Sequence, residues 1–188
     1  GLLLSHWEYE GETVHYCFEI PAGCTAALTL PDGRKVMLID TVGFIRRLPH
    51  NLVEAFKSTL EEAVCAKVIL NVCDASDPEC AEHLEVTNDL LNELGCSGKP
   101  TIPVFNKCDL ADKNTTNQWV EYYKKKGVRA IPVDCRTGKG LNNYLAAVRE
   151  VLKDVIKKNE DRGMPGKALR IMVVGIPNTG KSSFINRM

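Results

Sequence analysis

The sequence carries no net charge, because 24 Lys and Arg residues balance 24 Asp and Glu residues. The chain as a whole therefore lacks the basic field that marks many nucleic-acid-binding proteins. It has no apolar run of membrane-spanning length, and the apolar stretch at residues 2–4 is too short for a signal peptide. These absences predict a cytoplasmic protein that does not enter a membrane.

The cysteines lack the spacing of a metal site or of a disulfide framework. None of the eight belongs to a C-x-x-C pair, and no histidine stands at a co-ligand spacing. Several neighbour apolar residues, where a reduced thiol behaves as a small hydrophobic side chain. We therefore expect no structural zinc and a reducing compartment. The cysteines are Cys17, Cys24, Cys65, Cys73, Cys80, Cys96, Cys108 and Cys135.

Short apolar runs alternate with longer helical stretches in most of the chain, which is typical of a doubly wound α/β sheet. Residues 26–30 and 35–39 flank a Pro-Asp-Gly turn and predict an antiparallel hairpin. We expect a β-rich appendage at residues 1–24 and one domain at residues 25–188, with six strands in a mostly parallel sheet. The predicted strands are 26–30, 35–39, 68–73, 101–105, 129–133 and 171–174. The predicted helices are 52–65, 79–94, 115–126 and 141–159.

The strongest motif is a phosphate loop, GIPNTGKS at residues 175–182, which follows the apolar run 171–174. Its glycines let backbone N–H groups face phosphate oxygens at the start of a helix. In such loops Lys181 neutralises the β- and γ-phosphates, which makes it a candidate catalytic residue, and the Ser182 hydroxyl ligates Mg²⁺. We expect the Lys181 side chain to be solvated without a ligand. The predicted phosphate-binding residues are Asn178, Thr179, Gly180, Lys181, Ser182 and Ser183.

A second candidate, Asp40-Thr-Val-Gly43, directly follows the predicted strand 35–39. In phosphate-loop enzymes a strand-end Asp holds Mg²⁺, and the glycine N–H meets the γ-phosphate. Asp40 is therefore a candidate metal ligand and Gly43 a candidate catalytic residue, although D-x-x-G also occurs in ordinary turns. The next residue, Phe44, stands where many GTPases carry the glutamine that orients water, which an apolar ring cannot do.

The third motif, Asn106-Lys107-Cys-Asp109, follows the predicted strand 101–105, at the sheet edge where open α/β sheets bind ligands. N-K-x-D is the guanine-reading motif of the GTPase superfamily. The Asp109 carboxylate can accept both N1–H and N2–H of guanine, whereas adenine offers no matching donor pair. Asn106 is expected to tie neighbouring loops together, and the stem of Lys107 to lie along the base.

A base-supporting loop is predicted at residues 134–140, after the next strand. GTPases commonly place Ser-Ala-Lys here, with a backbone N–H on guanine O6, and this chain has Cys135 and Arg136 instead of the usual small pair. The metal loop thus comes first and the phosphate loop last, whereas a usual GTPase has the phosphate loop first. This order predicts a circularly permuted P-loop NTPase, with the last strand in the centre of the sheet, that binds GTP or GDP with Mg²⁺.

These motifs resemble two GTPase families. Residues 36–110 are similar to the G domain of the ribosome-associated HflX GTPases, through IDTVGFIRRLPH at 39–50, LVEAF at 52–56, DAS at 74–76 and PVFNK at 103–107. Residues 106–188 are similar to the circularly permuted ribosome-assembly GTPases of the RbgA/YlqF type. The residues there are QW at 118–119, GKGL at 138–141, RG at 162–163 and the phosphate loop.

The resemblance implies a Ras-like sheet and slow GTP hydrolysis that a ribosomal subunit stimulates, since both families commonly lack the catalytic glutamine. Thr25 is the nearest candidate for the switch threonine that completes Mg²⁺ coordination. Residues 5–33 resemble the C-terminal β-sandwich of bacterial α-L-rhamnosidases, through Trp7-Glu-Tyr, residues 18–26 and Leu30-Pro-Asp-Gly33. Stretches that resemble three different families meet at short motifs that the families share. This arrangement suggests a recombinant, designed or mis-assembled chimera.

Two alternatives to a GTPase stay open from the sequence. One is a guanine-nucleotide or ribosomal RNA binding module without hydrolysis, and the other is a folded chimera whose motifs are relics. A local basic cluster fits either an RNA contact or an ordinary solvated face. Its members are Lys124, Lys125, Lys126, Lys153, Lys157, Lys158, Arg162, Lys167 and Arg170.

Overall fold

The computed structural model describes residues 65–93, 95–164 and 167–188 with side chains, and the backbone of four earlier strands. These strands are β1 (Leu4–Glu10), β2 (Thr13–Glu19), β3 (Thr25–Thr29) and β4 (Lys35–Asp40). β1 and β2 form a two-stranded antiparallel sheet of their own, whereas β3 pairs antiparallel with β4 in a larger sheet. The helix predicted at residues 52–65 lies outside the described residues, apart from Cys65.

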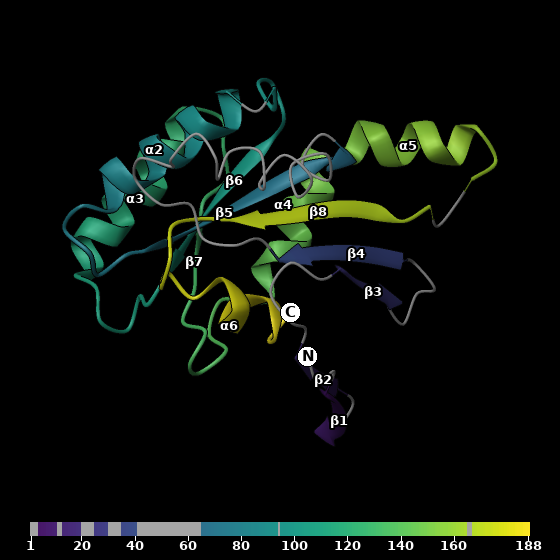
Figure 1. The fold of residues 1–188 in the computed structure, drawn as a ribbon, viewed down its shortest axis with the longest axis horizontal. Coiled ribbons are helices and arrows are strands. Elements are labelled where there is room, and N and C mark those ends of the chain that lie inside the picture. The colour runs from purple at the N-terminus through teal and green to yellow at the C-terminus, as the bar shows by residue number, and fades with distance from the viewer. Residues whose placement is uncertain are drawn as a thin grey trace, which may run out of the picture.

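The larger sheet places the last strand of the chain between two earlier ones. It also contains β5 (Val68–Asp74), β6 (Thr101–Asn106), β7 (Ile131–Pro132) and β8 (Leu169–Val174), in the order β3-β4-β8-β5-β6-β7. β8 runs parallel to both of its neighbours, and Figure 1 shows it crossing the middle of the molecule. The continuous apolar runs of β5, β6 and β8 form strands because helices bury both faces of a parallel sheet. The phosphate loop therefore leaves the sheet from an interior position.

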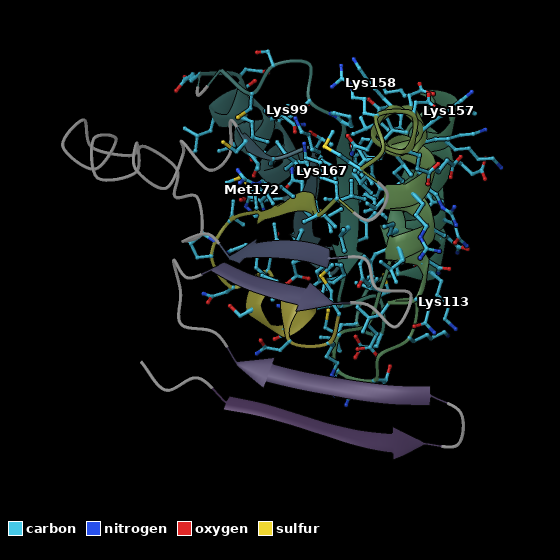
Figure 2. All side chains as sticks on the ribbon, turned by 90° about the vertical axis from the view of Figure 1, so that its right-hand side faces the viewer. Lys99, Lys113, Lys157, Lys158, Lys167 and Met172 are labelled. Atoms are coloured by element: carbon cyan, nitrogen blue, oxygen red, sulfur yellow. The ribbon has the colours of Figure 1, made fainter. Side chains whose placement is uncertain are left out.

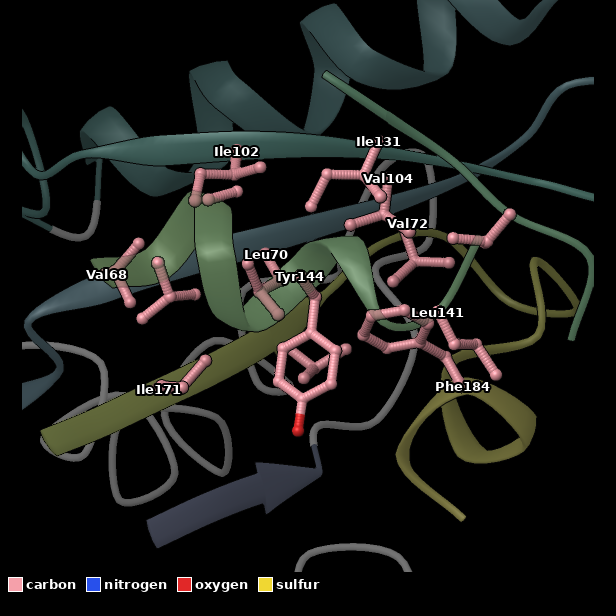
Figure 3. Packing of buried hydrophobic residues seen from close by; sticks show 14 of the residues in the cluster. Val68, Leu70, Val72, Ile102, Val104, Ile131, Leu141, Tyr144, Ile171 and Phe184 are labelled. Carbon is pink, nitrogen blue, oxygen red and sulfur yellow. The ribbon is translucent and has the colours of Figure 1, made fainter. Parts of the chain in front are cut away.

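One face of the sheet packs on α4 (Asn143–Val151) and on α6 (Lys181–Ile185), which directly follows the phosphate loop. Tyr144 of α4 meets Phe184 of α6 edge to face, with ring centroids 6.1 Å apart. Alternate residues of the strands, such as Leu70 and Ile171, lie under these rings and are fully buried (Figure 3). The helix after the phosphate loop is thus anchored in the largest hydrophobic core of the described residues.

The opposite face packs on α2 (Cys80–Glu93) and α3 (Lys113–Lys125). Leu91 of α2 joins Ile69 and Met172 of the sheet, and Phe105 of β6 stacks on Trp119 of α3 with centroids 6.3 Å apart. Because Phe105 directly precedes Asn106, this packing fixes the end of β6 where the base-reading motif begins. Among the described residues, none of the helices is long and apolar enough to cross a membrane.

Three elements show differences from the sequence prediction that have a clear position in the chain. The helix predicted from residue 115 begins at Lys113, because Asp112 caps it by accepting the Thr115 N–H at 2.8 Å. The strand predicted at 129–133 is only β7, an edge strand in which Pro132 has no N–H to donate to a ladder. The single helix predicted at 141–159 is wrong, because α4 ends at Val151 and α5 (Lys153–Asp161) follows after Leu152.

Candidate functional site

A cavity of about 810 Å³ lies at the carboxyl ends of the parallel strands. The loops after β6, β7 and β8 all contribute to it, although their residues lie up to 77 positions apart in the sequence. This is the edge at which open α/β sheets bind ligands. The structure thus brings the predicted phosphate loop and both predicted base loops to one place. The lining residues are Asn106, Lys107, Asp109, Leu110, Asp134, Cys135, Arg136, Asn178, Gly180, Lys181, Ser182 and Ser183.

The phosphate loop needs two of its glycines, because each has a positive φ and lies against a neighbouring residue. Gly175 has a φ of 146°, and a Cβ there would lie 2.2 Å from the carbonyl oxygen of Val72, so the loop starts in contact with β5. Gly180 has a φ of 91°, and a Cβ there would lie 2.3 Å from the side chain of Asn106. Between them Asn178 is held at a φ of 63°, a conformation that asparagine tolerates better than most residues. The chain can take this path only because no side chain occupies the two contacts.

Lys181 is not solvated, contrary to the sequence prediction. Its side chain is buried, and its Nζ donates a hydrogen bond to the Ile176 carbonyl at 2.9 Å. The buried Thr179 hydroxyl donates to the same carbonyl at 3.0 Å. The lysine therefore folds back over the loop and braces it from within. Removing this side chain would disturb the loop itself as well as any phosphate contact.

Asn106 joins the three loops, as the sequence predicts. Its Nδ2 donates to the Thr179 carbonyl in the phosphate loop at 2.8 Å. Its Oδ1 accepts the Cys135 N–H in the loop after β7 at 3.2 Å. Asn106 is 3% exposed, so both bonds lie in a dry environment where losing either one is costly. A single amide thereby sets the distance between the phosphate loop and the base loops.

Lys107 takes part in a contact that the sequence did not predict. Its Nζ lies 2.5 Å from Oδ2 of Asp74, the last residue of β5, while Oδ1 accepts the N–H and hydroxyl of Ser76. Burial raises the pKa of Asp74, but the hydrogen bonds from Lys107 and Ser76 outweigh this and hold the pKa below its ordinary value. The sequence signal that could have pointed to this contact is the Asp-Ala-Ser motif at residues 74–76. Lys107 itself has a φ of 59°, which turns its side chain back toward β5.

Asp109 and Arg136 form an ion pair across the mouth of the cavity. Arg136 Nη2 donates to Asp109 Oδ2 at 3.2 Å, and the side chains are 78% and 22% exposed respectively. The predicted base-reading carboxylate thus already has a guanidinium partner from the base-supporting loop. Nothing in the sequence spacing pairs these two residues, because they lie 27 positions apart in separate loops.

The loop after β7 is organised by Asp134, which sequence reasoning did not single out. Its Oδ1 accepts the N–H groups of Arg136 at 2.8 Å and Thr137 at 3.3 Å, and its Oδ2 accepts the Thr137 hydroxyl. The Thr137 hydroxyl, followed by these N–H groups, lowers the pKa of Asp134. Burial raises the pKa of the Cys135 thiol to about 12, so this side chain is a neutral small hydrophobe. The backbone donors of Cys135 and Arg136 are both engaged within the protein.

The predicted metal ligands are described only in part. Asp40 is the last residue of β4, and its backbone is in register with Val173 of β8, two residues before the phosphate loop. The Asp40 side chain and Gly43 lie outside the described residues. The Ser182 and Ser183 side chains are exposed at the start of α6. No group of three or more His, Cys, Asp or Glu side chains in the described part of the chain could hold a metal ion.

Known proteins are similar to this chain in sequence and in fold. The 50S ribosome-binding GTPase family model matches residues 22–107. The chain is 44% identical over 135 residues to GTPase HflX of Akkermansia muciniphila, covering 71% of this chain and 31% of that protein. It is 31% identical over 145 residues to Ribosome biogenesis GTPase A of Priestia megaterium, covering 77% and 48%. A crystal structure of an SsGBP variant matches with a TM-score of 0.56 at 30% identity, covering 70% of this chain and 47% of that chain.

The chain spans less than half the length of each of these relatives. The two curated matches cover 71% and 77% of the chain, so they overlap across at least about half of it. The resemblances to HflX and to the RbgA type therefore do not divide the chain into separate stretches near Asn106. Loop geometry and sequence similarity agree: the chain contains a GTPase domain of the α/β P-loop fold, with homologues among the HflX and ribosome biogenesis GTPases.

Proposed function

We propose that this chain binds GTP and GDP with Mg²⁺ and acts as a slow, ribosome-associated GTPase. The observation that carries the proposal is the Asn106 bridge, which fastens a phosphate loop and a guanine-reading loop to one cavity. An isolated phosphate loop would suit any nucleoside triphosphate, and an isolated N-K-x-D word could be a polar turn. Held together at the carboxyl ends of parallel strands, the two favour a guanine nucleotide.

The residues present fit such a ligand. The cavity volume lies within the range of small-molecule sites. Asp109 supplies a carboxylate for the N1–H and N2–H edge of the base, and α6, which begins at Lys181 after the N-cap Gly180, places its N-terminus beside the cavity for phosphates. Lys181 would exchange its Ile176 carbonyl for phosphate oxygens. Ser182 and Asp40 would hold Mg²⁺, which neutralises phosphate charge when bound.

We infer that the domain is a circularly permuted G domain at residues 25–188, with the β1–β2 hairpin as a separate appendage. In support, β8 follows all the other strands of the sheet in the sequence but lies between β4 and β5 in space. The phosphate loop follows β8 and therefore leaves the sheet from its interior. The antiparallel β3 lies at the edge beyond β4. A strand that must enter between two others raises contact order, so we expect slow folding.

Hydrolysis is expected to be slow because the sequence supplies no glutamine after Gly43. Phe44 stands at that position, and a partner must then complete the arrangement around the water. Thr25 is the proposed switch threonine: it begins β3 in register with Ile39, next to Asp40 in the sheet. Loss of hydrolysis with retention of binding is the alternative, a nucleotide-dependent binding module.

The proposal is tested by fluorescent GDP, GTP and ATP titrations with Mg²⁺. We expect micromolar guanine binding, weak adenine binding and slow phosphate release from GTP. Asp109→Asn should shift the preference from guanine toward xanthine nucleotides, because the amide donates where the carboxylate accepts. Guanine binding without turnover would favour the binding module. Absence of guanine binding would contradict both and would favour a folded chimera with relic motifs.

The proposed ribosomal partner has a candidate contact surface on α5 and the segment before β8. Lys157 and Lys158 are exposed in the middle of α5, and Lys167 is exposed just before β8 (Figure 2). Arg170, the second residue of β8, is exposed as well. Phosphate contacts by such residues weaken with salt. Sedimentation with ribosomal subunits should therefore show salt-sensitive binding that Lys157→Glu with Lys158→Glu reduces. Unchanged sedimentation of this variant would exclude the surface.

A further inference from the structure

The ion pair between Arg136 and Asp109 joins two loops that would enclose the same base. Both residues line the cavity, and the guanidinium lies 3.2 Å from Asp109 Oδ2. Asp109 is the aspartate of the N-K-x-D motif at residues 106–109, and its carboxylate is the group proposed to accept hydrogen bonds from the base. Arg136 therefore occupies the acceptor that the proposed base would use.

The guanidinium of Arg136 and the donor edge of guanine are chemically alike. The edge of guanine that N-K-x-D reads consists of N1–H and the amino group on C2, which together form a guanidine fragment. The arginine side chain carries the same fragment with more donors and a positive charge. We propose that Arg136 is an internal competitor for the guanine edge and sets both the affinity and the selectivity of the nucleotide site. This inference rests on the proposed guanine-nucleotide binding.

The geometry lets the side chain leave without moving the loop. The backbone N–H of Arg136 is fixed by Asp134 Oδ1 at 2.8 Å, so the loop keeps its shape whichever way the side chain points. The Arg136 side chain is 78% exposed, and on release its charge returns to water rather than to a buried position. An exposed pair of this kind is weak. A base can therefore displace it, at a modest cost to affinity.

The same contact predicts how the site treats a base that lacks the amino group. Hypoxanthine has N1–H but no donor on C2, so it satisfies only one of the two Asp109 oxygens. In a site without Arg136 the second oxygen is left unpaired, and unpaired acceptors are penalised. Arg136 can stay on that oxygen. It thereby narrows the difference in affinity between guanine and hypoxanthine nucleotides.

The test uses Arg136→Met, which keeps a long apolar stem and removes the guanidinium. Its control is Lys139→Met, which removes one positive charge from an exposed position in the same loop. GDP and IDP titrations with Mg²⁺ should show Arg136→Met binding GDP roughly 1.5- to 5-fold more tightly than the control. The ratio of IDP to GDP dissociation constants should increase in Arg136→Met relative to the control.

A GDP affinity of Arg136→Met that equals or falls below that of Lys139→Met would overturn the inference. The ligand-free contact is checked separately by ¹⁵N NMR of arginine side chains. The Arg136 guanidinium signal should shift on Asp109→Asn in the free protein, and an unshifted signal would also overturn it. If the unaltered chain binds no GDP at all, the proposed function fails, whereas the NMR result still decides whether the ion pair forms.

Discussion

Replacing Asn106 by Ala removes the buried amide that bonds to both the phosphate loop and the loop after β7. The substitution removes the Asn106 partner of the Thr179 carbonyl and of the Cys135 N–H. In the unaltered chain these two groups bond to Asn106 at 2.8 Å and 3.2 Å respectively. All three residues are less than 10% exposed, so water cannot replace the amide unless the loops open. An unpaired buried polar group costs about 1–3 kcal/mol. With two such groups, we therefore expect the free energy of unfolding to fall by about 2–6 kcal/mol.

Urea unfolding followed by circular dichroism measures this change. With a slope of about 2–3 kcal/mol per molar urea, the midpoint should fall by about 0.7–3 M. Asn88→Ala is the control, since Asn88 is exposed within α2 and alanine is the better helix former. Its midpoint should stay unchanged or rise slightly. If Asn106→Ala differs from this control by less than about 0.5 kcal/mol, the amide does not hold the loops together.

Two further substitutions probe the loops on either side of this bridge. Gly175→Ala places a Cβ 2.2 Å from the Val72 carbonyl at a φ that alanine disfavours, so the phosphate loop must move off β5. Titration should show loss of guanine-nucleotide binding, and unchanged binding would mean that the loop relaxes freely. For Asp74, burial raises the pKa, but the hydrogen bond from Lys107 helps to hold it below its ordinary value. The resulting stability is complete above the unfolded pKa of about 3.9 and is lost as pH falls through the lowered folded value. The unfolding deficit of Asp74→Asn should therefore stay constant above about pH 5 and shrink as pH falls through the lowered folded pKa of Asp74, and a deficit that stays constant in acid would contradict the ion pair.

The sequence predicted those parts of the site that are short, local motifs. The phosphate loop and N-K-x-D are recognisable because each follows an apolar strand, and parallel strands carry such loops to one edge. The bridging role of Asn106 followed from the same reasoning. Helix α2 was predicted to within one residue at each end. The boundaries of α3 and β7 were less accurate, since a cap and a proline decided them.

Contacts between loops were not predictable, because the partners lie far apart in the sequence. Asp74 and Lys107 are 33 positions apart, and no spacing rule relates them. Arg136 and Asp109 meet only because β6 and β7 are neighbours in the sheet. The burial of Lys181 also escaped prediction, since a lysine in a loop ordinarily reaches water. Its contact with Ile176 depends on how tightly the loop folds back on itself.

The sequence by itself determined the candidate chemistry of this protein: which loops are proposed to hold phosphate, which carboxylate is proposed to read guanine, and in what order they occur. Those properties belong to residue types at short spacing, where backbone geometry leaves few choices. The tertiary structure alone decided which groups are already engaged with one another. Lys181 braces its own loop, Lys107 is tied to Asp74, and Arg136 covers Asp109. These partners are set by strand order, because charged groups pair with whatever the sheet places within reach.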